Sequence, residues 1–373
     1  ERPVEDRFSW YHNMQSVVDA GVCVRSNQLD FDESVSHRAV RWIYDQARED
    51  DPRPFCLTVS FTHPHDPYNI TQKHWDLYAP EDIDALYVDP IPFESLDAHS
   101  QRVARICNLD PAALTRSQVL NARRAYYGAV SYIDDKVGEL VRTLADTGLA
   151  DNTVIVFTSD HGDMLGDRGL WYKMTFYEWS ARVPLIISAP NRFPGRTVDQ
   201  NVSLLNLFPT LVDIGSNKPL PAYAEGVNRD SLMPLLMGAR ENQAAPVVAE
   251  YLAEGAVAPC FMVLKNRCKY IFSEPDPPLL FDLAKDPDER TNLAGKPDDN
   301  ALENELHGEV ENRWDRDRIK CDVIDNQQRR RIVFEAQMQG RHTPWDHQPK
   351  EDASQQYMRN HLLLDDLELS RRI

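Results

Sequence analysis

Asp160 and His161 are adjacent residues whose types suit metal chemistry. They come directly after residues 153–157, TVIVF, a β-branched and aromatic run that predicts an interior strand of a helix-covered sheet. Open α/β sheets bind their ligands beyond the carboxyl ends of such strands. A carboxylate oxygen beside an imidazole nitrogen suits Ca²⁺, Mn²⁺ or Mg²⁺ and discriminates poorly among them. We therefore predict that Asp160 and His161 bind a divalent metal; the alternative is a helix cap beside a buried structural histidine.

A second cluster of polar side chains also follows an apolar run. Residues 55–61, FCLTVSF, predict a buried strand, and THPHDPY comes next. The sequence thus predicts a second strand whose end carries site residues.

Helices and strands alternate around these two strand ends. An amphipathic helix is predicted over residues 32–49 with Asp32 as its cap. A longer helix begins at a capping box formed by Thr115 and Gln118, and Gly148 closes it. Residues 69–114 lack periodicity and predict a long loop or surface excursion.

The second half of the chain changes character near Pro246. Before it, residues 183–188 predict a strand and residues 204–215 a helix; after it, short strands predict a small antiparallel sheet, followed by a charged helical region. We expect an α/β fold, a mixed sheet with helices on both faces, in three parts: a large α/β domain over 1–240, the small sheet over 241–298, and a helical region with a tail over 299–373.

Composition excludes some classes of partner. The net charge of −18 and the absence of a basic stripe argue against a nucleic-acid ligand. The sequence has no run of about 18 apolar residues, which is the length that a membrane-spanning helix requires. Six scattered cysteines without metal-like spacing predict free thiols and a cytoplasmic location. The chain begins at Glu1, without Met, and we expect an N-terminal truncation.

Several motifs together resemble the sulfatase branch of the alkaline-phosphatase superfamily. They are SDHGDMLGDRGLWYK, THPHDPY, VPLII, NLFPTL and LLFDLAKDPDERTNLA. Within that branch, SFTHPHDPY, GDRGLWYKMTFYEWSARVPL, PWDHQP and YMRNH are similar to the bacterial choline-sulfatases, over essentially the whole chain. The resemblance implies an alkaline-phosphatase-like fold and hydrolysis of a sulfate ester, choline-O-sulfate above all, to an alcohol and sulfate.

One departure from that family concerns the nucleophile. Such sulfatases carry an earlier strand with metal-binding acids and a Cys-x-(Pro or Ala)-x-Arg motif whose Cys becomes formylglycine. This chain has no such motif, and Cys23, in VCVRSN, does not match it. The resemblance implies a nucleophile and further metal ligands outside this chain, which alone should be inactive.

The resemblance also gives roles to residues near the two strand ends. His65 matches the histidine near the ester oxygen and becomes the candidate general acid, while His63 braces its loop. Lys173 would hold a sulfate oxygen, unless it is an ordinary solvated lysine. Asp163 is expected to support the metal site or to cap a turn. Ca²⁺ is the metal that the resemblance favours.

Choline recognition must use carboxylates and aromatic faces, because a quaternary ammonium has no hydrogen to donate. Asn13 and Glu254 match residues of the family's choline pocket, with a solvated surface role as the alternative. Asp365 matches an acid that reaches a neighbouring subunit's pocket, which implies a homo-oligomer, a dimer or a tetramer; the alternative is a frayed terminal helix.

Two other functions remain open at this point. The chain could belong to another hydrolase of the superfamily, acting on aryl or alkyl sulfates, phosphonates or phosphodiesters. A non-catalytic scaffold or osmolyte-binding protein is the third hypothesis, if the nucleophile is truly lost.

Overall fold

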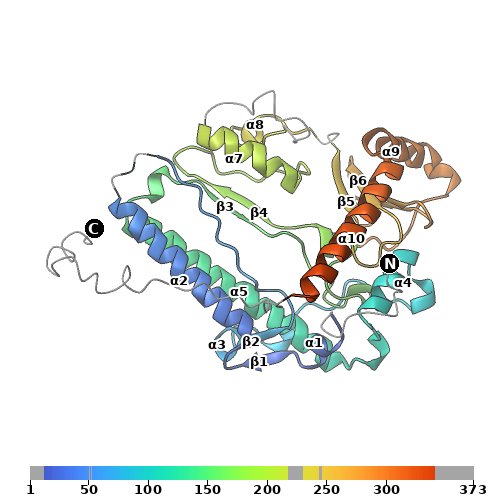
Figure 1. Cartoon of the computed structure of the whole chain (residues 1–373), viewed down its shortest axis with the longest axis horizontal. Helices are drawn as coiled ribbons and strands as arrows, with labels where there is room; N and C mark the ends of the chain where they lie inside the picture. The colour runs from blue at the N-terminus through green and yellow to red at the C-terminus, as the bar shows by residue number, and fades with distance from the viewer. Residues whose placement is uncertain (1–11, 50, 52, 217–229, 243–245, 341–373) are drawn as a thin grey trace.

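Two long helices form the largest helical layer of the molecule (Figure 1). The computed structural model describes residues 12–49, 51, 53–216, 230–242 and 246–340. Helix α2 (Asn27–Arg48) packs along α5 (Arg116–Asp146). The predicted capping box of α5 is confirmed: Gln118 N donates to Thr115 Oγ1 at 3.2 Å, and the Gln118 side chain accepts from Thr115 N at 2.9 Å.

Helix α2 begins earlier than the sequence predicted. The hydroxyl of Ser26 accepts from Leu29 N at 3.2 Å and caps the helix. Asp32, the predicted cap, lies inside the helix and is completely buried. Its carboxylate instead accepts the ring Nδ1–H of His63 at 2.6 Å and the backbone N–H of Thr62 at 2.7 Å. The prediction was wrong because Asp32 fixes a distant loop rather than its own helix end.

The strand before Asp160 is confirmed, but its setting differs from the prediction. Strand β3 (Ile155–Thr158) pairs antiparallel with β4 (Leu185–Ser188), and all four β3 residues are only half-buried. Strand β1 (Gly21–Cys23) pairs in parallel with β2 (Asn69–Thr71). Within the described residues these are two separate two-stranded pieces.

Residues 55–61 do not form the predicted buried strand. They are extended, and several side chains, including Leu57, are exposed. Their backbone groups make no hydrogen bond to any described residue. A strand forms only when a neighbour accepts and donates these bonds, so the apolar pattern alone was insufficient.

The predicted excursion over 69–114 is partly ordered. Besides β2 it contains α3 (Gln72–Trp75) and α4 (Ala98–Ile106), which begins where Asp97 accepts from Ser100 N at 2.9 Å. The remaining short elements before the C-terminal sheet are helical. They are α1 (Gln15–Val18), α6 (Glu178–Ala181), α7 (Leu207–Ser216) and α8 (Met233–Leu236), with 3₁₀ turns at Pro80–Asp82, Phe93–Ser95, Pro111–Ala113, Ala150–Asn152, Asp167–Gly169 and Leu204–Asn206.

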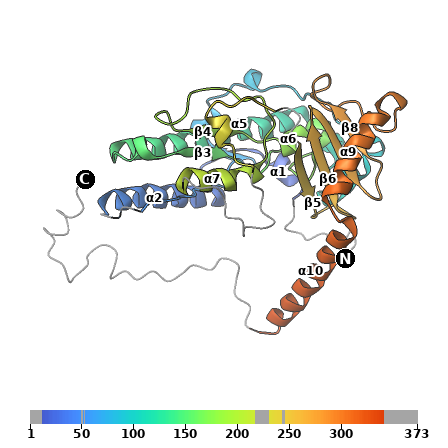
Figure 2. The same ribbon diagram turned by 90° about the horizontal axis from the view of Figure 1, so that it is seen from above.

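The C-terminal antiparallel sheet is confirmed. Its strands follow one another in chain order: β5 (Val247–Tyr251), β6 (Cys260–Lys265), β7 (Cys268–Ser273) and β8 (Leu279–Asp282). After the turn Pro297–Asp299, α9 (Asn300–Arg313) buries Leu306 and Val310 against this sheet. Helix α10 (Arg316–Met338) buries no side chain and projects from the body in Figure 2. The boundaries at 240 and 298 stay a prediction.

A buried lysine ties this sheet to the rest of the chain. Lys269 of β7 is 1% exposed, and its Nζ lies 2.5 Å from Glu178 Oε1 and 2.9 Å from Glu289 Oε1. The same Nζ donates to the carbonyl of Phe176 at 2.8 Å. The C-terminal sheet therefore fixes the segment that follows Lys173.

The state of the cysteines and the absence of a membrane span were both predicted from the sequence. All six cysteines are free thiols, as expected. In the part of the chain that the structure describes, none of the helices has the length and apolarity needed to cross a bilayer.

Candidate functional site

Asp160 and His161 follow the end of β3, and their side chains lie close together. The ring Nδ1 of His161 donates to the carbonyl of Gly162 at 2.8 Å, which leaves the Nε2 lone pair available. Oδ2 of Asp160 lies 3.5 Å from that Nε2, and its side chain is 84% exposed. Two ligands at right angles around an ion with bonds of about 2.3 Å stand roughly 3.3 Å apart. The pair therefore fits a shared divalent cation.

Gly162 is required at its position by a close backbone approach. A Cβ there would lie 2.1 Å from the carbonyl oxygen of Trp179. Gly162 N also donates to Ser180 O at 2.8 Å. The turn that orients His161 is therefore hydrogen-bonded to the backbone of α6.

His65 and Lys173, the two predicted catalytic residues, are in direct contact. Lys173 Nζ lies 2.8 Å from Nε2 of His65. The rings of His65 and His161 are 6.5 Å apart. The structure therefore brings the candidate acid, the candidate sulfate-binding lysine and one candidate metal ligand into one place.

Asp66 shares its carboxylate between two histidines. His65 Nδ1 lies 3.0 Å from Oδ1, and His12 Nδ1 lies 3.1 Å from Oδ2. Burial alone would raise the pKa of Asp66, but the hydrogen bonds from His12 and His65 hold it well below its usual value. In return, the hydrogen bond to Asp66 raises the pKa of His65, although burial and Lys173 oppose this.

Asp163 supports the segment that carries Lys173. Its carboxylate accepts from Leu165 N at 2.9 Å, from Tyr172 N at 3.0 Å and from the hydroxyl of Tyr68 at 2.8 Å. Tyr172 has a φ of 67°, a conformation that costs a residue with a side chain about 1 kcal/mol or more. These bonds hold the backbone in that conformation, and the bond from Leu165 N is that of a turn cap, one of the two roles expected of Asp163.

The predicted choline-facing residues, Asn13 and Glu254, are both linked to this segment by contacts. The backbone carbonyl of Asn13 accepts from the hydroxyl of Tyr172 at 2.5 Å. Asn13 therefore contacts the residue that precedes Lys173 in the chain. Glu254 is exposed, and its Oε2 accepts from Tyr251 OH at 3.2 Å.

Tyr251 connects Glu254 to the same segment. Its ring lies edge-on to His99 at 5.7 Å, and His99 Nε2 donates to the carbonyl of Met174 at 2.6 Å. Burial lowers the pKa of His99, which keeps this ring neutral. Glu254 is therefore linked through two rings to the residue after Lys173. Asp365 lies outside the described residues.

His12 and Asp66 were missed by sequence reasoning. His12 sits next to Asn13 in WYHN, and Asp66 follows His65, so both are neighbours of residues that were singled out. Their spacing of 54 residues gives no sign that they meet. His63, expected to brace its loop, does so through Asp32.

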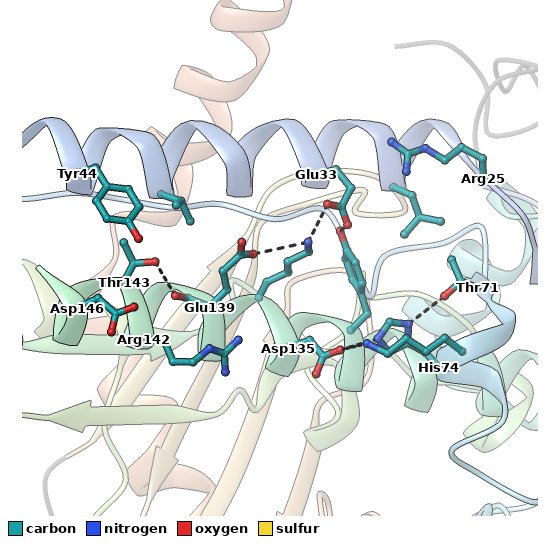
Figure 3. Close-up of a pocket in the computed structure, with 15 residues that line it drawn as sticks. Arg25, Glu33, Tyr44, Thr71, His74, Asp135, Glu139, Arg142, Thr143 and Asp146 are labelled. Atoms are coloured by element: carbon teal, nitrogen blue, oxygen red, sulfur yellow. Dashed lines mark hydrogen bonds and ion pairs between the residues drawn. The ribbon is translucent and has the colours of Figure 1, made fainter. Parts of the chain in front are cut away.

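A large cleft lies elsewhere in the described residues, between α2 and α5 (Figure 3). It has a volume of about 760 Å³, and none of the candidate site residues lines it. Several of its charges are paired with one another: Lys136 Nζ lies 2.8 Å from Glu33 Oε2, and His74 Nε2 lies 3.1 Å from Asp135 Oδ2. Arg142 and Asp146 also line it.

Comparison with known proteins identifies the family. Residues 6–216 match the sulfatase family, residues 166–316 match the N-sulphoglucosamine sulphohydrolase C-terminal domain, and residues 321–373 match the choline sulfatase C-terminal region. The chain belongs to the sulfatase family, the sulfuric ester hydrolases that generally use a divalent metal and a formylglycine.

Individual relatives show which kinds of hydrolase the chain is similar to. A choline-sulfatase from Rhizobium meliloti (strain 1021) is 44% identical over the whole chain, which spans 73% of that relative. An arylsulfatase K from Xenopus laevis is 36% identical over half of this chain and 36% of its own length. The crystal structure of a phosphonate monoester hydrolase from Agrobacterium radiobacter matches 83% of this chain and 65% of its own, with a TM-score of 0.64 and 24% identity. The last match shows the shared fold, as the sequence predicted.

Proposed function

We propose that this chain supplies the leaving-group and sulfate-binding side of a choline-O-sulfate hydrolase. The contact between Lys173 and His65, with His161 beside it, is the observation that carries the proposal. An ammonium, an imidazole and a metal-ligand pair in one place suit a tetrahedral anion whose ester bond must break. The 44% identity to a choline-sulfatase supports the choice of substrate.

Asp160 and His161 would hold the divalent ion, with Ca²⁺ favoured over Mn²⁺ and Mg²⁺. When bound, that ion neutralises charge on the sulfate oxygens. A formylglycine from outside this sequence would supply the nucleophilic oxygen, since the chain has no Cys-x-(Pro or Ala)-x-Arg motif.

Lys173 would bind the sulfate group, and His65 would act as the general acid. Without substrate, Nε2 of His65 accepts from the Lys173 ammonium. A sulfate oxygen is the better acceptor for that ammonium, so substrate binding releases Nε2. His65, protonated at Nε2 and steadied at Nδ1 by Asp66, then donates its proton to the departing alkoxide of choline. The raised pKa of His65 favours the protonated state that this step needs.

The trimethylammonium group would lie beside Glu254 and Asn13. Glu254 provides the negative charge, and the ring of Tyr251, bonded to it, provides an aromatic face. We propose that Asp365 of a neighbouring subunit completes this pocket, in a homo-oligomer. Exposed apolar residues on α10, among them Ile332 and Phe334, are consistent with such an assembly. Free cysteines support a cytoplasmic location.

The test compares two esters on the protein that contains this chain together with a matured formylglycine segment. We expect kcat/KM for choline-O-sulfate to exceed that for 4-nitrophenyl sulfate, and Glu254→Gln to raise KM for the choline ester only. Preference for the aryl ester, or for a phosphonate monoester, would replace the substrate assignment. Reading the codons before Glu1 separates the enzyme from a scaffold, because the enzyme requires the missing motif in frame.

A further inference from the structure

A second group of metal-capable side chains lies next to the pair already described. It consists of His12, His65 and Asp66, and one ligand atom of each lies within 4.8 Å of the other two. Two of the separations are short: His12 Nδ1 to Asp66 Oδ2 is 3.1 Å, and His65 Nδ1 to Asp66 Oδ1 is 3.0 Å. No other such group occurs in the described part of the chain.

We propose that His12, His65 and Asp66 form an inhibitory site for a transition-metal ion of the Zn²⁺ type. Two imidazoles and one carboxylate suit Zn²⁺, Ni²⁺ or Cu²⁺, whereas Ca²⁺ and Mg²⁺ prefer oxygen ligands. Three protein ligands leave a fourth position open for water or an anion. The site is therefore distinct in chemistry from Asp160 and His161, which offer only one nitrogen.

One ligand atom of each of the three residues lies within 4.8 Å of the other two, which is near the spacing that a tetrahedral ion needs. With bonds of about 2.1 Å, ligand atoms around Zn²⁺ stand roughly 3.4 Å apart. The separations of 3.0 and 3.1 Å reach different oxygens of Asp66, so the side chains must turn for one ion to bind both imidazoles and the carboxylate. The ion would take the place of two Nδ1 protons. The proton of His12 is now accepted by Asp66 Oδ2 at 3.1 Å, and that of His65 lies between the Asp66 backbone carbonyl at 2.7 Å and Oδ1 at 3.0 Å.

Other contacts hold the ligands in place before any metal binds. Gln28 Nε2 donates to the Asp66 carbonyl at 2.6 Å, and Ser16 Oγ donates to Asp66 Oδ2 at 3.3 Å. The His12 ring stacks on Tyr172 with centroids 4.5 Å apart. Asp66 and His12 are 10% and 16% exposed, and His65 is 34% exposed, so the ion has a route from solvent.

Metal binding would change the hydrogen-bonding role of His65. A neutral ring that binds an ion through Nδ1 carries its proton on Nε2. Nε2 then becomes a donor, and it can no longer accept from Lys173, whose Nζ lies 2.8 Å away. In the proposed mechanism an imidazolium gives up its Nε2 proton and becomes a neutral ring. A ring that binds the ion through Nδ1 could give up that proton only by becoming an imidazolate, so it is a much weaker acid. Inhibition, though not binding, rests on the proposed function, because it follows only if His65 is the acid.

The binding test uses the 373-residue chain and does not depend on turnover. Zn²⁺ affinity is measured by titration calorimetry, and Co²⁺ reports the ligand set by its visible absorption. We expect His12→Gln and Asp66→Asn to weaken Zn²⁺ binding by about 10-fold or more, because each removes one of three ligands. His37→Gln, an exposed histidine on α2, is the matched control and should leave the affinity unchanged. Asp160→Asn removes the carboxylate of the neighbouring pair, so the Zn²⁺ binding that it retains belongs to the proposed site.

Lys173→Met provides a test in the opposite direction. It should tighten Zn²⁺ binding, because no ammonium then opposes the Nε2 proton of metal-bound His65. Thermal unfolding of each variant shows whether the fold is kept. Equal affinity in the wild type and folded His12→Gln, or loss of binding in Asp160→Asn, would overturn the proposal. Failure of choline-O-sulfate hydrolysis alone would leave the metal site intact and remove only its inhibitory role.

Discussion

Lys173 and His65 meet at 2.8 Å, Nζ to Nε2, although 108 residues separate them in the chain. His65 comes from the loop after the unpaired segment 55–61, and Lys173 from the segment that Asp163 and Lys269 secure. The two residues are adjacent because separate hydrogen-bond networks fix each loop. The predictions below test these networks and the chemistry they support.

Replacing Lys173 by Met should weaken the binding of inorganic sulfate. A hydrogen bond from an ammonium to an anion contributes about 1.5–3 kcal/mol, which corresponds to roughly a 10- to 100-fold loss in affinity. Titration calorimetry with sodium sulfate measures the change. Lys320→Met, at an exposed position on α10, is the control, and an unchanged affinity in Lys173→Met would argue that this lysine is an ordinary surface residue.

Gly162→Ala should destabilise the turn after His161. The new Cβ would stand 2.1 Å from the Trp179 carbonyl, and backbone on both sides must move. Crowding of this kind costs about 1–3 kcal/mol in the free energy of unfolding, measurable by urea denaturation. Gly308→Ala in α9 meets no atom within 4 Å and should be neutral or stabilising. Equal stability of the two variants would contradict the close approach.

Lys269→Met should cost more than removal of a surface lysine. The change leaves Glu178 and Glu289 facing each other without a cation, and breaking a buried ion pair in this way costs about 3–5 kcal/mol. The pKa of Glu289 is already raised, chiefly by burial, and it should rise further without Lys269. A raised carboxyl pKa means that folding takes up a proton, so the deficit should shrink as the pH falls from 7 toward 4. Unfolding curves at both pH values check this, and a deficit independent of pH would be the contrary result.

Asp32 should make stability fall on acidification. Burial alone would raise its pKa, but the His63 ring and two backbone N–H groups hold it below the ordinary value. Its contribution is therefore fully present above the ordinary carboxyl pKa of about 4 and is lost as the pH falls through the folded pKa. Asp32→Asn should lower the melting temperature at pH 7 and reduce its fall below pH 4. Exposed Asp298→Asn should behave like the wild type. If Asp32→Asn melts like the wild type at every pH, the bond to His63 contributes nothing.

Much of the site could be predicted because its residues follow recognisable patterns. Asp160 and His161 end an apolar strand, and His65 and Lys173 lie in motifs shared with a known family. The structure brings His65, His161 and Lys173 together. The C-terminal sheet and α5 were also predictable, since short strand-like runs joined by a tight turn and a capping box are local signals.

The remaining features depend on contacts between distant residues. Asp32 has the sequence context of a helix cap, yet its carboxylate accepts a hydrogen bond from His63, in a loop thirty-one residues away. Residues 55–61 have the composition of a strand but no backbone partner among the described residues. His12 and Asp66 can be recognised as neighbours of the site only once the fold brings their two loops into contact. None of these relationships has a local sequence signal.

The central claim is that Asp160 and His161 hold the divalent ion opposite His65 and Lys173. Anomalous scattering from a crystal of the formylglycine-containing protein soaked with Mn²⁺ tests it directly. We predict a peak about 2.0–2.6 Å from an Asp160 carboxylate oxygen and from His161 Nε2, and its loss in Asp160→Asn. A protein that turns over choline-O-sulfate with its metal bound elsewhere, and with no peak at this pair, would contradict the account.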